Sequence, residues 1–216
     1  MNLTLKESLV TRSRVFSPWT AFYFLQSLLI NLGLGYPFSL LYTAAFTAIL
    51  LLLWRTLPRV QKVLVGISSL VAACYFPFAQ AYGAPNFNTL LALHSTNMEE
   101  STEILTIFPW YSYLVGIFIF ALGVIAIRRK KESEKARWNT FDSLCLVFSV
   151  ATFFVAPVQN LAWGGVFKLK DTGYPVFRFA KDVIVNNNEV IEEQERMAKL
   201  SGMKDTWTVT AVKPKY

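Results

Sequence analysis

The sequence predicts an all-α membrane protein with five transmembrane helices, and three observations support this class. First, 54% of the 216 residues are hydrophobic and 16% are charged, whereas about a quarter of the residues in a typical soluble domain are charged. Second, the apolar residues form blocks that are long enough to cross a bilayer core of about 30 Å, which takes roughly 20 helical residues. Third, the basic residues gather between alternate blocks.

Five apolar blocks meet the length requirement. The first is not followed by a small-residue cleavage site, so we interpret it as a retained signal-anchor. The turn-like sequence GLGY joins the first two blocks and predicts an antiparallel hairpin. Cys74 and Cys145 both fall inside blocks, where we expect free, buried thiols. The blocks cover residues 18–34, 37–54, 63–82, 110–127 and 141–161.

The distribution of basic residues predicts the topology. Residues 34–36 and 83–109 contain no Lys or Arg, and these segments lie on one side of a five-span layout. The positive-inside rule therefore places the N-terminus in the cytoplasm and the C-terminus outside it, on the other side of the membrane. The net charge of +7 is thereby explained without a nucleic-acid partner, which would need the basic residues on one solvated face. The basic residues of the other side are Lys6, Arg12, Arg14, Arg55, Arg59, Lys62 and the run RRKKESEKAR.

The polar segment between the third and fourth blocks predicts an extracytoplasmic helix over about residues 86–105. Asn86 is a suitable helix cap, and Asn88, Ala92, Thr96 and Glu100 follow at a spacing of four, which places them on one face. The alternative interpretation is a solvated acidic loop.

The sequence contains no recognisable metal or catalytic motif. His94 has no Cys, Asp or His partner at ligand spacing, so we expect a surface or packing role for it. No phosphate-binding glycine loop, HExxH or GxSxG occurs either. A small transporter is disfavoured because the blocks hold almost no ionisable residue, and we interpret Asp142 as a cap at the start of the fifth span.

The composition changes after the fifth block. Val176, Phe179, Val183 and Ile184 recur at helical spacing, which predicts an amphipathic segment at the membrane surface. A second, more solvated helix is predicted over about residues 188–200, followed by a linker. Four basic side chains of this region are expected to meet lipid phosphates, namely Lys168, Lys170, Arg178 and Lys181.

The segment YGAPNFNTLLALHSTNMEESTEIL, followed by a span that opens PWYSYL, resembles the membrane domain of bacterial phosphoethanolamine transferases. The resemblance extends over the five-span layout and the tail GYPVFRFAKDVIVNNNEVIEEQERMAKLSG, and it is closest to the enterobacterial members that act on osmoregulated periplasmic glucans. It implies a multi-pass inner-membrane enzyme with a periplasmic alkaline-phosphatase-like domain. In that domain a zinc-bound threonine takes phosphoethanolamine from phosphatidylethanolamine and passes it to an acceptor.

The resemblance also implies how this chain is divided. Residues 1–165 would form the five-span domain with the helix at about 86–105, and residues 166–216 would form periplasmic amphipathic helices and a linker. The nucleophile and zinc ligands of the family have no matching positions here, so this chain by itself is expected to have no catalytic residue, no metal and no cofactor. Its partners would be phosphatidylethanolamine, membrane lipid and, through the missing domain, an acceptor glycan or lipid. The alternative is a non-enzymatic membrane scaffold or a truncated lipid-binding protein.

The relatives that modify lipid A imply the site residues. They carry an Asn-x-x-x-Thr-x-x-x-Glu pattern that is associated with the head group of the donor lipid. The match places the threonine at Thr96 and the glutamate at Glu100, whereas the asparagine position is Ala92. Asn88, one turn earlier on the same face, is the candidate substitute, although it could equally cap its own helix. Tyr82 corresponds to a family tyrosine at the mouth of the site.

Overall fold

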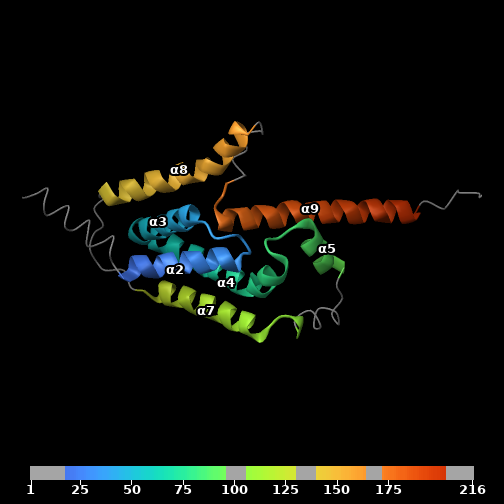
Figure 1. The fold of residues 1–216 in the computed structure, drawn as a ribbon, viewed down its shortest axis with the longest axis horizontal. Coiled ribbons are helices and arrows are strands. Elements are labelled where there is room, and N and C mark those ends of the chain that lie inside the picture. The colour runs from blue at the N-terminus through green and yellow to red at the C-terminus, as the bar shows by residue number, and fades with distance from the viewer. Residues whose placement is uncertain (1–17, 96–105, 130–139, 164–171, 203–216) are drawn as a thin grey trace, which may run out of the picture.

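The computed structural model describes residues 18–95, 106–129, 140–163 and 172–202, and this part of the chain is helical, as predicted (Figure 1). Each of the five predicted spans coincides with one helix, and two further helices follow the third and fifth spans. The helices are α2 (Pro18–Gly33), α3 (Leu40–Thr56), α4 (Pro58–Tyr82), α5 (Phe87–Ser95), α7 (Trp110–Arg128), α8 (Thr140–Ala162) and α9 (Pro175–Gly202).

Within the described residues, three helices are long and apolar enough to cross a membrane, namely α4, α7 and α8. The apolar helix α3 is shorter, at 17 residues, and α2 has 16 residues. The structure thus supports a membrane protein, while the five-span layout and the orientation of the termini stay predictions. The helix α4 begins five residues before the predicted block, because Pro58 is well suited to the first turn of a helix, where its missing N–H costs nothing.

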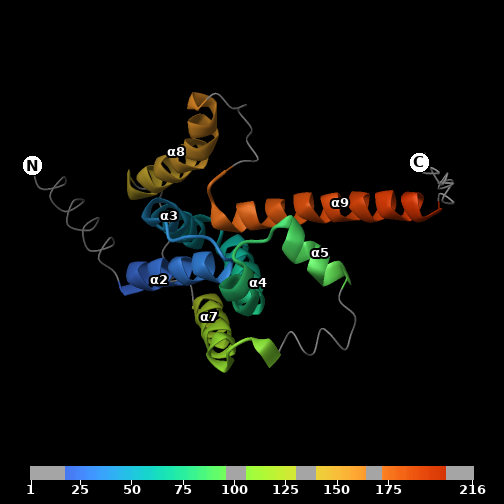
Figure 2. The same ribbon diagram turned by 45° about the vertical axis from the view of Figure 1, so that its right-hand side comes forward.

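The bundle has two ends, which we name from the predicted topology. The inner end holds the start of α2, the end of α3 and the end of α7, and the outer end holds the end of α2, the end of α4 and the helix α5 (Figure 1). The helix α8 packs against α3, on the side of the bundle away from α7 (Figure 2).

Small residues let the central helices approach closely. A Cβ atom on Gly116 of α7 would lie 2.7 Å from the carbonyl oxygen of Ala73 in α4, and one on Gly123 would lie 2.6 Å from Cβ of Ser69. Both distances are shorter than a van der Waals contact, so glycine is required at these two positions. Such contacts are the usual basis of helix packing in membranes, where lipid is as apolar as the side chains.

Polar pairs lie inside the bundle between these apolar contacts. The side chain of Gln26 donates a hydrogen bond to Ser69 Oγ (3.1 Å), and that of Asn31 donates one to Thr43 Oγ1 (3.0 Å). Each pair joins α2 to a different neighbour, α4 in the first case and α3 in the second. Because unpaired polar groups are costly in an apolar interior, these pairs favour one register between the helices.

An ion pair fixes α8 at the inner end. Asp142, in the first turn of α8, contacts Arg55 in the last turn of α3, and the Asp142 residue is only 2% exposed. The sequence suggested a capping role for Asp142, and the structure adds this bond to a neighbouring helix. Arg55 thus forms an ion pair with Asp142, in addition to being one of the basic residues that predict the topology.

Residues 175–202 form one long helix, α9, where the sequence suggested two. The predicted break near Asn188 is absent, and the asparagines before it have partners outside the helix: Asn186 donates to the carbonyl of Pro85 (3.5 Å) and Asn187 accepts from His94 (2.8 Å). In Figures 1 and 2, α9 begins beside the bundle and points away from it in roughly the direction of α2. A helix resting flat on a membrane that α2 crosses would instead run across that direction.

Replacing Asp142 by asparagine should lower the free energy of unfolding by about 3 kcal/mol, because Arg55 would keep a largely buried charge without its carboxylate. Denaturant unfolding in micelles measures this loss. The matched control is Glu193→Gln, which removes an exposed ion pair to Arg196 and should change stability by no more than about 0.5 kcal/mol. Equal effects of the two substitutions would contradict the structural role of the Arg55–Asp142 pair.

Candidate lipid head-group site

The helix α5 begins as the sequence predicted, with an asparagine cap. The Oδ1 atom of Asn86 accepts hydrogen bonds from the backbone N–H of Thr89 (3.0 Å) and from its hydroxyl (3.1 Å). Thr89 is buried, whereas Asn86 itself is exposed. Since Asn86 fills the capping role, Asn88 is not needed for it.

Two of the four predicted site residues lie in the described part of the chain, and both are at the outer end. Asn88 is exposed in the first turn of α5. Tyr82 is the last residue of α4, is 53% exposed and makes an edge-to-face contact with Phe108. The turn from Gly83 to Asn86 separates them in the chain. Thr96 and Glu100 lie outside the described residues, so their grouping on one face with Asn88 stays a prediction.

His94 contacts α9, in agreement with the packing role expected for it. Its Nε2 atom donates a hydrogen bond to Oδ1 of Asn187 (2.8 Å). No group of three or more potential metal ligands occurs among residues 18–95, 106–129, 140–163 and 172–202. The histidine therefore holds α5 against α9.

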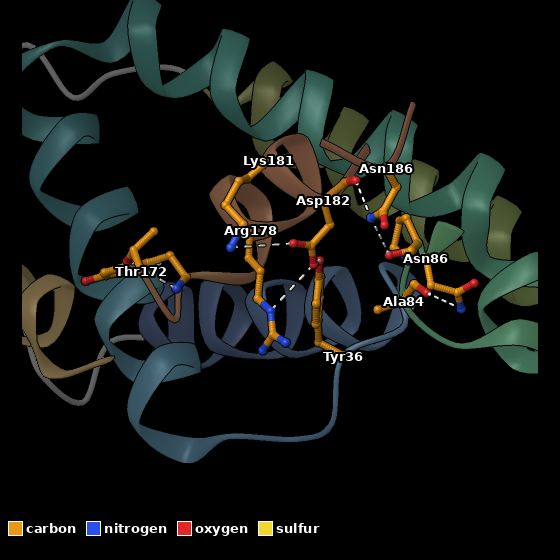
Figure 3. Close-up of polar contacts among 10 residues, drawn as sticks. Tyr36, Ala84, Asn86, Thr172, Arg178, Lys181, Asp182 and Asn186 are labelled. Carbon is orange, nitrogen blue, oxygen red and sulfur yellow. Dashed lines mark hydrogen bonds and ion pairs between the residues drawn. The ribbon is translucent and has the colours of Figure 1, made fainter. Parts of the chain in front are cut away.

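A polar cluster around Asp182 joins α9 to the outer end (Figure 3). The carboxylate of Asp182 accepts a hydrogen bond from the hydroxyl of Tyr36 (2.7 Å) and lies 3.6 Å from Nε of Arg178 and 3.8 Å from Nζ of Lys181. The Arg178 guanidinium also lies over the Tyr36 ring, 4.9 Å from its centroid. We call these four residues the Asp182 cluster.

Burial controls the protonation of the phenol in this cluster. Tyr36 is only 5% exposed. This burial is the largest cause that raises the pKa of Tyr36 well above its usual range, and the hydrogen bond to Asp182 is the next largest. The phenol therefore remains a donor to the carboxylate at physiological pH. Two cations face a single carboxylate here, which leaves the cluster with a positive charge.

Close backbone contacts bring the two outer loops together beside this cluster. Gly35 has a positive φ of 79°, and any Cβ atom there would collide with the carbonyl group of Gly83. On the far side of the same turn, the side chain of Asn186 donates to the carbonyl of Pro85 (3.5 Å). The loop after α2, the loop before α5 and α9 thus form one unit, which sets where α5 lies.

Sequence reasoning did not find Tyr36 or Asp182. Only the spacing of Arg178 and Asp182, four residues apart on a predicted helix, offered a signal for the ion pair. The contact with Tyr36 spans 146 positions of the chain, which no local pattern could indicate.

The comparisons with known proteins agree with the predicted resemblance. No family model matches the chain, and no solved structure matches it. The chain is 99% identical over all 216 residues to the phosphoethanolamine transferase OpgE of Escherichia coli (strain K12), and it spans 41% of the length of that protein. The resemblance of this chain to phosphoethanolamine transferases, first suggested by its residues 82–105 and 109–114, is therefore confirmed over its whole length.

Proposed function

We propose that these 216 residues form the membrane part of a phosphoethanolamine transferase, which anchors the enzyme in the bacterial inner membrane and presents phosphatidylethanolamine as the donor. The observation that carries this proposal is the 99% identity to a protein of that name over a segment that is 41% of its length. The apolar helices α4, α7 and α8 support the membrane location. The transferred group would pass to a periplasmic acceptor, for which osmoregulated periplasmic glucans are the proposed class.

The proposed donor site is built on the outer end, from Tyr82, Asn88, Thr96 and Glu100. Phosphatidylethanolamine presents an ammonium and a phosphodiester at the membrane surface. A carboxylate such as that of Glu100 pairs with the ammonium, while the Thr96 hydroxyl donates to a phosphate oxygen or accepts from the amine. Neither residue would be the nucleophile, which we assign, with its zinc, to a domain outside these residues.

The structure supports the placement of this site through α5. The helix is held at its start by the Asn86 cap and at its end by the bond between His94 and Asn187. The exposed side chain of Asn88 is available for a ligand because the cap does not use it. We therefore propose Asn88 as the amide that replaces the family asparagine at the Ala92 position.

Glu100→Gln and Thr96→Ala in the full-length enzyme should each lower phosphoethanolamine transfer about tenfold or more, since a hydrogen bond to a charged group is worth about 1.5–3 kcal/mol. Membrane insertion should not change. Glu99→Gln is the control, because this neighbouring carboxylate is not one of the proposed head-group ligands. Unchanged transfer in both site variants would reject the head-group assignment, and absence of transfer by the unaltered enzyme would favour the scaffold alternative.

Asn88→Ala and Asn86→Ala separate binding from capping. Asn86→Ala should lower stability by about 1 kcal/mol through loss of the helix cap, whereas Asn88→Ala should leave stability unchanged and weaken the binding of phosphatidylethanolamine. Denaturant unfolding and lipid binding by native mass spectrometry give the two readouts. The proposed role of Asn88 would be contradicted if its removal lowered stability but not lipid binding.

A further inference from the structure

A cationic stack lies at the inner end of the bundle, remote from the donor site. The guanidinium of Arg129, which follows α7, lies 4.0 Å from the ring centroid of Trp19 and 3.7 Å from that of Trp54. Two indole rings from α2 and α3 therefore hold one guanidinium, and such cation–π contacts fix its position. We call Trp19, Trp54 and Arg129 the inner stack.

Two hydrogen-bond donors of the inner stack have no acceptor. The Nη1 atom of Arg129 and the Nε1 atom of Trp54 are both buried and both lack a hydrogen-bond partner. A buried donor without a partner costs about 1–3 kcal/mol, and a charged one costs more. Since both orphan groups are donors, the group that would satisfy them is an acceptor.

The charge at this end indicates an anionic acceptor. Arg55, Arg59, Lys62, Arg128 and Arg129 supply five cations, while Asp142 is the only acidic residue at the inner end within residues 18–95, 106–129 and 140–163. That carboxylate contacts Arg55. The positive charge of Arg129 would therefore be neutralised by a group that is not among the described residues.

We propose that the inner stack binds the phosphodiester of a phospholipid from the leaflet at the inner end, which the topology predicts to be the cytoplasmic one. Tryptophan is enriched at the level of lipid head groups, so Trp19 and Trp54 mark the depth at which phosphates lie. A guanidinium matches the geometry of two phosphate oxygens. Because both orphan nitrogens are covered, the lipid enters when a covering side chain moves aside, and it should stay bound through purification.

The test uses the purified 216-residue chain in detergent, with native mass spectrometry of bound dioleoylphosphatidylglycerol. The matched competitor is dioleoylglycerol, which has the same acyl chains and no phosphate. The unaltered chain should retain the phospholipid in preference to dioleoylglycerol. Arg129→Gln should reduce this retention about tenfold, and Trp54→Phe, which keeps an aromatic ring but removes the N–H, should reduce it less.

Arg128→Gln is the control for a general effect of charge, because Arg128 is the adjacent and exposed arginine; it should retain the lipid as the unaltered chain does. Arg129→Lys covers the case in which Arg129→Gln fails to fold, and this variant should also lose retention because an ammonium lacks the planar fork of a guanidinium. Equal loss in the Arg128 and Arg129 variants, or equal retention of the two lipids, would overturn the proposal. Displacement of the phospholipid by millimolar inorganic phosphate would show a small-anion site and would overturn the lipid assignment.

Discussion

The carboxylate of Asp182 is the interaction on which the outer end of the molecule depends. It accepts a hydrogen bond from Tyr36 in the loop after α2, and it pairs with two cations of its own helix. The same stretch of α9 reaches the loop before α5 through Asn186 and the end of α5 through Asn187. One segment of α9 therefore sets the position of α5, and with it the position of Asn88.

The two ends of the bundle use the same residue types for different purposes. At the outer end, Arg178 pairs with the carboxylate of Asp182 and lies over the Tyr36 ring, so its partners are within the protein. At the inner end, Arg129 has two indole rings and an N–H without an acceptor. This difference is the reason that we assign an external lipid phosphate to Arg129 and a structural role to the Asp182 cluster.

Hydropathy and capping patterns predicted much of this fold. Each predicted span coincides with a helix, and the Asn86 cap was predicted from its residue type, because both features depend on local chemistry. The single long helix α9 was not predicted, since its run of asparagines is stabilised by contacts with Pro85 and His94, which are distant in the chain. For the site, the sequence indicated Tyr82 and Asn88, but the Tyr36–Asp182 contact depends on tertiary structure.

The most direct measurement asks which lipid lies beside α5. A photoreactive amino acid at the exposed position Ala92, next to Asn88 on the predicted face, would capture lipid from native membranes, and one at the exposed position Val147 of α8 would report the bulk lipid. Mass spectrometry of the captured lipids then compares the two positions. The account predicts that phosphatidylethanolamine is enriched at Ala92 relative to Val147, and the same lipid composition at both positions would contradict it.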